Sequence, residues 1–234
     1  MYSIIVPCYN EEKNIKKLVK VFKELKEEIN NLEIILVNNG SEDNTKEEIK
    51  KAIKEYPWIK AVNIKKNQGY GHGILTGLKV SSGEWKGWIH ADLQISPKVF
   101  LNFIEIIESK NRNNYFFKGL RKKRPIIDTV FTIGMSVFES LYLKTILWDI
   151  NAQPTLLHKN LFEKLIDPPL DFSFDLYTFY KAKKNNYKIV RIPVLQYDRE
   201  EGNSSWNTGM SSRLKLIKRT IQFSKNLKKG TLSR

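Results

Sequence analysis

Acidic, amide and basic side chains follow the apolar runs of this chain, at positions where they could bind phosphate groups. The run Gly87–Ile89 leads into His90, Asp92 and Gln94. Mg²⁺ typically takes one or two protein carboxylates and completes its octahedron with phosphate oxygens and water. A lone carboxylate followed two residues later by an amide suits such a shared ion. These residues therefore predict a metal-assisted enzyme that uses a nucleotide.

Two earlier apolar runs, Ser3–Val6 and Glu33–Val37, open in the same way into polar loops at 7–12 and 38–43. Buried strands whose C-terminal ends carry polar residues form a ligand crevice at the edge of an open α/β sheet. The three runs together predict such a crevice, with residues from all three loops around it.

Apolar periodicity locates the elements that must position these side chains. The strands are expected at 2–6, 33–37, 59–64 and 84–89, and the helices at 12–28, 43–54 and 68–79. This alternation is the signature of an α/β fold with a parallel, doubly wound sheet flanked by helices. A helix at 97–109 and a strand near 115–118 follow, and from there the alternation stops.

The segment Ile126–Trp148 is apolar and long enough to raise the question of a membrane span. Each apolar residue gains only ~0.3–0.6 kcal/mol on insertion, whereas a charge at the helix centre costs ~2.5–3.5 kcal/mol. Glu139 lies near the centre, and Asp128 and Lys144 lie near the ends. We therefore expect interfacial helices or a buried helical hairpin rather than a spanning helix.

The stretch Ser211–Lys229 is a second amphipathic candidate, with leucines and isoleucines set among lysines and arginines. Each basic residue near an anionic leaflet is worth ~1 kcal/mol, so several would attach the chain reversibly to a membrane surface. A solvated helix that packs one stripe on the domain is the alternative. We predict a domain at 1–210, including an apolar segment at 125–148, and a basic helix or tail at 211–234.

Composition limits the cellular compartments and the classes of binding partner that fit this chain. The single cysteine, Cys8, excludes an internal disulfide and fits a reducing compartment. The N-terminus shows no signal-peptide pattern, which predicts a cytoplasmic protein. A net charge of +15 calls for an anionic partner: nucleic acid, a membrane surface or a phosphorylated substrate. No recognition-helix, RNA-binding or zinc motif supports a nucleic-acid-binding module.

The motifs Ser3–Glu12 (SIIVPCYNEE), Ile35–Thr45 (ILVNNGSEDNT) and His90–Gln94 (HADLQ) resemble the first landmarks of family 2 glycosyltransferases. Gly119–Arg121, Asn151–Pro154, Asp171–Asp175 and Arg199–Trp206 resemble the later landmarks of the branch that includes dolichyl-phosphate mannose synthase. The resemblance runs from Ser3 to about Asn207. It implies a GT-A fold, which is Rossmann-like and mostly parallel, with the apolar helical segment inserted after the core.

The resemblance also implies the site residues. Asp92 and Gln94 match the metal-binding positions, for Mg²⁺ or Mn²⁺. The nucleotide pocket that it implies consists of Pro7, Tyr9, Glu11, Asn39, Ser41, His90 and Asp92. Arg121, Gln153, Arg199 and Ser205 match positions near the diphosphate or a phosphate-bearing acceptor, where an arginine fork binds phosphate oxygens in two places. Asp92, Asp175 and Arg199 form the implied catalytic set.

Two positions depart from the family pattern. Asn39 stands where an aspartate usually reads the base or ribose; a carboxylate only accepts hydrogen bonds, whereas an amide also donates. Guanine offers two adjacent donors and favours the acid, so Asn39 favours a UDP-sugar over a GDP-sugar. His90 replaces the first acid of an Asp-Ala-Asp motif, and either contacts the ribose or a phosphate or simply closes the strand. With one carboxylate fewer, we expect metal binding to need the nucleotide.

The expected activity is transfer of a sugar, with inversion, from a nucleotide diphosphate to a polyprenyl phosphate at the inner face of the cell membrane. The alternative is transfer to a saccharide hydroxyl, for which Asp171 or, preferably, Asp175 would be the base. A phosphate acceptor is already an anion and needs no base, so Asp175 would then cap its helix or position a basic side chain. Three further possibilities stay open. The protein could be a degenerate relative that binds a nucleotide without turnover, it could form a homo-oligomer, or it could bind a membrane partner subunit.

Overall fold

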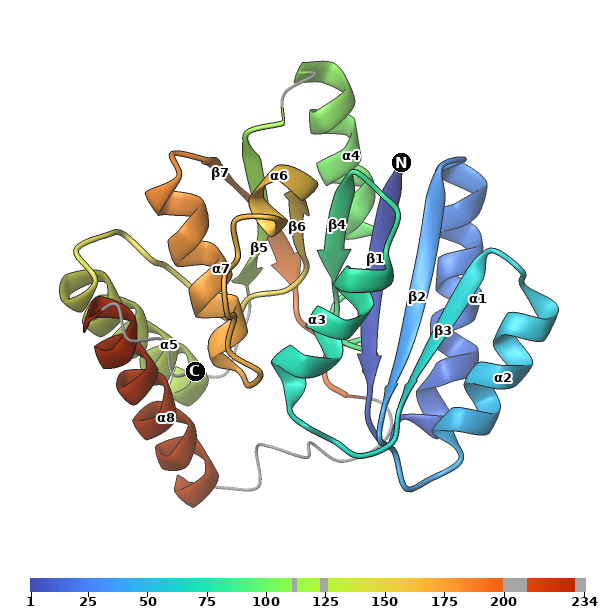
Figure 1. Ribbon diagram of the computed structural model, residues 1–234, viewed down its shortest axis with the longest axis horizontal. Coiled ribbons are helices and arrows are strands. Elements are labelled where there is room, and N and C mark those ends of the chain that lie inside the picture. Colours follow the sequence, from blue (N-terminus) through green and yellow to red (C-terminus); the bar gives the residue numbers. More distant parts are fainter. Residues whose placement is uncertain (111–112, 123–125, 200–209, 230–234) are drawn as a thin grey trace.

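A computed structural model describes residues 1–110, 113–122, 126–199 and 210–229 of the 234-residue chain (Figure 1). One seven-stranded sheet with the strand order β3-β2-β1-β4-β6-β5-β7 forms its centre. The strands are β1 (Tyr2–Cys8), β2 (Leu32–Asn39), β3 (Ile59–Ile64), β4 (Trp85–Trp88), β5 (Tyr115–Lys122), β6 (Thr155–His158) and β7 (Lys188–Leu195). Among these described strands, only β6 pairs antiparallel to its neighbours, so the carboxyl ends of the other six meet at one edge.

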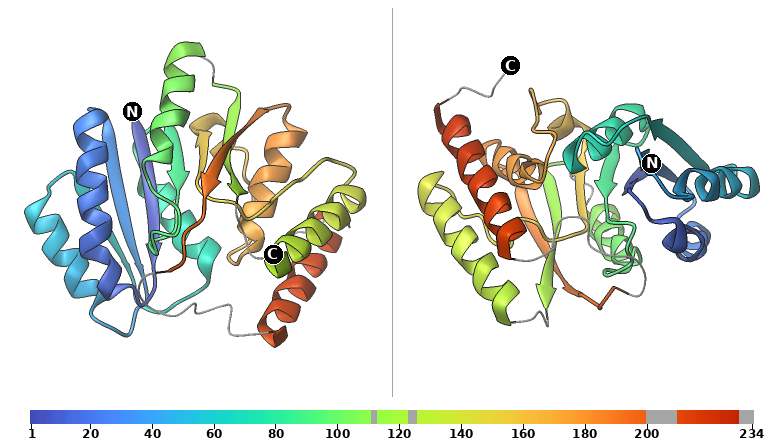
Figure 2. Two further views of the ribbon diagram at one scale, coloured as in Figure 1. Left: turned by 180° about the vertical axis from the view of Figure 1, so that it is seen from behind. Right: turned by 90° about the horizontal axis from the view of Figure 1, so that it is seen from below.

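Eight helices surround this sheet in the described part of the chain. They are α1 (Glu12–Glu28), α2 (Thr45–Glu55), α3 (Tyr70–Val80), α4 (Val99–Lys110), α5 (Ile126–Tyr142), α6 (Lys159–Phe162), α7 (Ser173–Lys184) and α8 (Met210–Lys229). Side chains of successive strand residues point to opposite faces, so Ile4 and Val6 pack against α1 and α2 while Ile5 packs against α3. Figure 2 shows the resulting helical layers on the two faces.

Helices α5 and α8 lie side by side beyond α7, at one end of the sheet (Figures 1 and 2). Their contact is polar and buried. The Ser224 hydroxyl of α8 donates to Glu139 Oε2 of α5 at 2.6 Å, and both residues are fully buried. Burial raises the pKa of Glu139 to about 7. The acidic residue of the apolar segment thus binds the second helix.

Most apolar side chains of α5 point outward, opposite to the usual arrangement of a helix in a globular protein. Ser136 and Glu139 are buried, whereas Ile126 is 82% exposed and Leu141 is 76% exposed. The other exposed apolar side chains of α5 are Ile127, Val130, Ile133, Val137 and Phe138. We call these seven residues of α5 the apolar face. Within the described residues, none of the helices is both long enough and apolar enough to cross a bilayer.

The predicted α/β fold with a mostly parallel sheet is confirmed, and α8 matches the helix expected at 211–229. The helical-hairpin alternative for 126–148 is wrong, because the segment holds one helix that ends at Tyr142 and then turns through 143–148. Strands β6 and β7 were not predicted. Cys8 is fully buried, and burial raises the pKa of its thiol.

Candidate active site

A cleft of about 720 Å³ opens at the edge where the parallel strands end. It runs from the loops after β1 and β2, past the loop after β4, to the inner sides of α5 and α8. Eleven of the thirteen residues predicted for the site line it. They are Pro7, Tyr9, Glu11, Asn39, His90, Asp92, Gln94, Arg121, Gln153, Asp175 and Arg199.

The remaining two predicted residues lie elsewhere. Ser41 is outside the lining, where its hydroxyl accepts from the Asn10 backbone N–H at 3.1 Å and its own N–H donates to Asn38 Oδ1 at 3.1 Å. It therefore joins the loops after β1 and β2 rather than facing the cleft. Ser205, with the rest of the predicted motif after Arg199, falls outside the residues that the structure describes.

Arg199 joins the two carboxylates at the centre of the cleft. Its Nη2 lies 2.9 Å from Asp92 Oδ2 and its Nη1 lies 3.4 Å from Glu11 Oε1. Burial raises the pKa of Glu11, against the lowering effects of a hydrogen bond from Asn14 and of the Arg199 charge. The other Asp92 oxygen accepts from the Gln94 backbone N–H at 3.2 Å, which fixes the turn after the strand.

A stack of three rings forms one wall next to Asp92. Tyr70 of α3 lies between His90 and Phe172, with ring centroids 5.1 Å and 4.8 Å apart and nearly parallel planes. His90 therefore has a defined orientation at the wall of the cleft. The sequence gives no sign of this stack, because Phe172 lies about 100 residues after Tyr70 and no local pattern links the three rings.

Asn39 lines the cleft and holds a buried acceptor without a partner among the described residues. Its Nδ2 donates to the Gly69 carbonyl at 3.0 Å, and Gly69 has a φ of +112° that favours glycine. Asn39 is 4% exposed, and its Oδ1 is buried without a hydrogen-bond partner among the described residues. An unpaired buried acceptor costs about 1–3 kcal/mol. A ligand that brings an N–H or O–H to this oxygen would recover that cost.

Asp175 lies at the floor of the cleft, in the first turn of α7, and both of its oxygens are occupied. Oδ1 accepts from Trp88 Nε1 and from Lys118 Nζ, each at 3.2 Å. Oδ2 accepts from the Tyr70 hydroxyl at 3.1 Å and from Gln153 Nε2 at 3.5 Å. The other acid of this region, Asp171, lies just before the helix and accepts from the Ser173 backbone N–H at 2.8 Å.

Lys118, which pairs with Asp175 behind the cleft, is a buried residue that sequence reasoning missed. It is 0% exposed, and its ammonium also donates to Thr155 Oγ1 at 3.1 Å. Burial lowers the pKa of Lys118, whereas the charge of Asp175 raises it. Its signal in the sequence is a single lysine that follows three aromatic residues in an apolar strand, because such a strand does not bury a charge without a partner.

Arg121 is held beside the cleft by a buried carboxylate. Its Nε lies 2.9 Å from Asp149 Oδ1, its Nη2 contacts the same oxygen, and its backbone N–H donates to Asp149 Oδ2 at 2.9 Å. Burial raises the pKa of Asp149, but the charge and hydrogen bonds of Arg121 lower it more, so the pKa lies below its usual value. Asp149 therefore fixes the direction of Arg121 at the rim of the cleft.

The far end of the cleft is apolar and belongs to the two outer helices. Phe131 and Met135 of α5 line it, and Leu216 and Ile217 of α8 do the same. Charged side chains and an apolar end thus share one cleft. Among the described residues, no group of three or more His, Cys, Asp or Glu side chains could hold a metal ion.

Comparison with protein families matches residues 3–162 to the family model described as glycosyl transferase family 2. The dolichol-phosphate mannosyltransferase of Pyrococcus furiosus is 26% identical over 208 residues, which cover 86% of this chain and 58% of that protein. A dolichyl-phosphate beta-glucosyltransferase of Trichomonas vaginalis is 38% identical over 96 residues, or 38% of this chain and 30% of that protein. The chain thus spans little more than half the length of the first relative and less of the second.

Solved structures share the fold. A mannosyltransferase of Pyrobaculum calidifontis in complex with GDP-Man and Mn²⁺ has a TM-score of 0.66 at 17% identity, over 95% of this chain and 69% of that one. Glucosyl-3-phosphoglycerate synthase of Mycobacterium tuberculosis in complex with Mn²⁺, UDP and glucosyl-3-phosphoglycerate has a TM-score of 0.72 at 14% identity, over 100% and 81% of the two chains. The family model covers more than half of the sequence, and the two relatives named above agree with the branch expected from its later motifs: the chain belongs to glycosyltransferase family 2.

Proposed function

We propose that the protein transfers a sugar from a nucleotide-diphosphate donor to a polyprenyl phosphate at a membrane surface. The observation that carries this proposal is the course of the cleft. It leads from Asn39, past Asp92 and Arg199, to its apolar end, which side chains of α5 and α8 line. A donor nucleotide fits the first part by its chemistry, and a phosphate followed by a hydrocarbon chain fits the second. The two relatives whose names include dolichol or dolichyl phosphate support the same assignment.

Asn39 supports a UDP-sugar as the donor. Because its Nδ2 is bound to Gly69, the side chain offers the base one acceptor, Oδ1. Uracil has a single ring N–H that one acceptor satisfies, whereas guanine presents two adjacent donors and would leave one of them unpaired. Tyr9 and Pro7 line the same end of the cleft and would pack against the base.

The residues present fit a divalent cation that is shared with the donor. Asp92 is a carboxylate at the centre of the cleft, and an Mg²⁺ or Mn²⁺ ion held by one carboxylate takes its other ligands from phosphates and water. We propose Asp92 and Gln94 as its protein ligands. When bound, the ion would neutralise charge on the departing diphosphate. The structural relatives crystallised with Mn²⁺ support this requirement.

In the proposed reaction, an oxygen of the acceptor phosphate forms a bond to the anomeric carbon as the bond from that carbon to the diphosphate breaks. The nucleotide diphosphate leaves on the opposite face, which inverts the configuration. Negative charge builds on the leaving group, and Arg199 is placed to stabilise it, since fixed cationic donors count most where charge develops. Arg121, held by Asp149, is placed to bind the acceptor phosphate.

The occupied oxygens of Asp175 favour a phosphate acceptor over a saccharide hydroxyl. A general base needs a free lone pair directed at the proton that it removes. Asp175 already accepts four hydrogen bonds, one of them from the Lys118 ammonium. An acceptor that arrives as an anion requires no base, so this arrangement is compatible with transfer to a phosphate.

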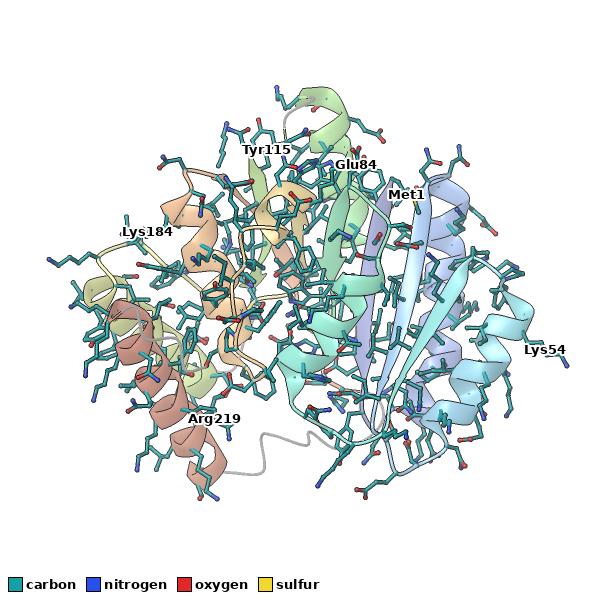
Figure 3. The ribbon with its side chains drawn as sticks, in the orientation of Figure 1. Met1, Lys54, Glu84, Tyr115, Lys184 and Arg219 are labelled. Atoms are coloured by element: carbon teal, nitrogen blue, oxygen red, sulfur yellow. The ribbon has the colours of Figure 1, made fainter. Side chains whose placement is uncertain are left out.

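The outer helices support attachment to a lipid surface. The apolar face of α5 is exposed. The basic side chains of α8 are exposed as well (Figure 3, where Arg219 is labelled): Lys215, Lys218, Arg219, Lys225, Lys228 and Lys229. A helix pair with this composition suits the boundary of an anionic bilayer, where apolar side chains enter the acyl region and cations meet the headgroups. The mouth of the cleft between these helices would then open toward the lipid acceptor.

The test is a screen of UDP-, GDP- and CDP-sugars with Mg²⁺ or Mn²⁺, with and without a short polyprenyl phosphate. We expect metal-dependent release of UDP that rises sharply with the lipid, and loss of release in Asp92→Asn. Release that does not respond to polyprenyl phosphate would move the assignment to a saccharide acceptor. Tight nucleotide binding without turnover under every condition would contradict the proposal.

A further inference from the structure

We propose that Gln153 selects the donor sugar by accepting a hydrogen bond from one of its hydroxyl groups, and that Lys118 and Asp175 set the direction of this amide. The inference rests on the proposed function and adds to it a residue that determines sugar specificity. Its basis is a chain of contacts that runs from the buried Lys118 to the cleft.

The first step is the charge balance at Asp175. Lys118 and Asp175 are 0% and 2% exposed and lie 3.2 Å apart, so each neutralises a charge that could not be buried otherwise. Trp88 and Lys118 take one carboxylate oxygen, and this leaves Oδ2 for donors that come from the cleft side. Both oxygens of Asp175 therefore meet donors, and those on the cleft side come from Tyr70 and Gln153.

The second step is the direction of the Gln153 amide. Its Nε2 donates to the Tyr70 hydroxyl at 2.6 Å and lies 3.5 Å from Asp175 Oδ2, while the Tyr70 hydroxyl itself donates to Asp175. Burial and the charge of Asp175 raise the pKa of Tyr70 well above its usual value, so its hydroxyl stays protonated. An amide turned the other way would place its oxygen against the carboxylate. Asp175 thus fixes which end of Gln153 is the nitrogen.

The third step is the oxygen that remains. Gln153 lines the cleft and is 2% exposed, and its Oε1 is buried with no partner among the described residues. A ligand that donates an O–H group to this oxygen would supply the missing hydrogen bond. Tyr70, which holds the amide, stacks on His90, two residues before Asp92. The unpaired oxygen therefore belongs to the part of the cleft where the sugar next to the diphosphate would lie.

The test uses the full chain and a parent donor sugar together with its set of monodeoxy analogues. In the wild-type protein, we expect one deoxy donor to lose at least about tenfold in kcat/KM, because the buried Oε1 is then left unpaired. In Gln153→Met, which keeps the volume and removes the acceptor, we expect the parent donor to lose a similar factor. The same deoxy donor should then lose nothing further.

The role of the ion pair is tested by Lys118→Met, by Asp175→Asn and by the two substitutions together. Each single change leaves one buried partner unmatched and should lower transfer, whereas the double variant removes both charges and should recover activity above either single variant. Lys86→Met is the matched control, since Lys86 is also buried in a strand but binds Ser81 and does not line the cleft.

The outcomes separate this inference from the proposed function. If the wild-type protein transfers the parent sugar but no deoxy donor loses more than about twofold, the inference about Gln153 is wrong and the proposed function stands. This comparison needs no variant, so it holds even if Gln153→Met does not fold. A double variant no more active than Asp175→Asn would overturn the role of Lys118. If no donor is a substrate of the wild type, the proposed function itself fails.

Discussion

The guanidinium of Arg199 lies 2.9 Å from the carboxylate of Asp92, the residue expected to bind the metal. A divalent ion at Asp92 must therefore compete with a cation that the protein already supplies. The phosphates of a donor would change this balance, because they offer Arg199 a second anion and offer the ion further oxygen ligands. The ion pair gives a physical reason for metal binding that depends on the nucleotide.

The first prediction concerns the order of binding. We expect Mn²⁺ to bind weakly to the protein without nucleotide and at least tenfold more tightly in the presence of UDP, as measured by calorimetry or by the EPR signal of free Mn²⁺. Arg199→Met should raise the affinity of the nucleotide-free protein for Mn²⁺, since Asp92 and Glu11 lose their shared cation, and should at the same time lower transfer.

Arg121→Met is the control for that experiment, because Arg121 pairs with Asp149 and not with Asp92. It should leave the affinity for Mn²⁺ of the nucleotide-free protein unchanged. Equal Mn²⁺ affinities with and without nucleotide in the wild type would contradict the competition between Arg199 and the ion.

The second prediction concerns the base. Asn39→Asp should lower the ratio of UDP affinity to GDP affinity, because the carboxylate offers two acceptors to guanine. It also loses the hydrogen bond to the Gly69 carbonyl, so the unfolding free energy should fall by about 1–3 kcal/mol. Titration calorimetry with both nucleotides and thermal unfolding measure the two effects.

Asn38→Asp is the matched control for Asn39→Asp. Asn38 is as buried as Asn39 but binds Asn63 Oδ1 through its Nδ2 and does not line the cleft. It should lower stability without changing the preference between nucleotides. A preference for UDP that survives Asn39→Asp unchanged would mean that another residue reads the base.

These residues also show what the sequence could and could not reveal. Asp92 follows a strand whose apolar run is visible locally, and parallel strands bring their carboxyl ends together wherever such a sheet forms. Arg199 follows β7, which was not predicted, so only the family resemblance pointed to it. Lys118 and Asp175 meet only through the order of strands β4, β6 and β5, which no local pattern encodes. Strand β6 has four residues, too few for a periodic signal, so its position and the site residues beside it required the structure.

The same limit explains the interpretation of α5. Apolar periodicity shows that the apolar residues of a helix lie on one side. It does not show whether that side faces the core. In this protein, Ser136 and Glu139 face inward because α8 supplies Ser224, and Asp149 donates its backbone N–H to Ser136 at 3.1 Å. The fully buried residues of α5 are polar, and most of its apolar residues face outward, whereas Phe131 and Met135 line the cleft.

The third prediction concerns the apolar face. Ile127→Ser, Val130→Ser and Leu141→Ser together should reduce binding to anionic vesicles by at least tenfold, because each buried aliphatic side chain is worth about 1 kcal/mol or more. Transfer to a water-soluble, short-chain polyprenyl phosphate should change little. Cosedimentation with vesicles that contain phosphatidylglycerol measures the first quantity.

Val80→Ser is the control for the apolar face, since Val80 is exposed at the end of α3. It should bind vesicles as the wild type does. The attachment should also weaken with salt, because exposed basic residues such as Lys225 and Lys229 contribute through screened charges. Unchanged vesicle binding in the triple variant would assign the apolar face to another partner.

The last prediction concerns pH and the contact between α5 and α8. In the unfolded chain, Glu139 ionises near 4.5, whereas burial raises its pKa to about 7 in the folded protein. Between these values the folded state holds a proton that the unfolded state releases, so the contribution of Glu139 to the unfolding free energy is complete below about pH 4.5. It is lost as the pH rises to about 7, by at most about 3 kcal/mol.

Glu139→Gln cannot ionise and should gain stability relative to the wild type over this range, with the difference levelling off above pH 7. Denaturant unfolding of both proteins at a series of pH values measures that difference, and Glu105→Gln, a change at an exposed residue of α4, should show none of it. A difference independent of pH would mean that Glu139 keeps the same charge in both states.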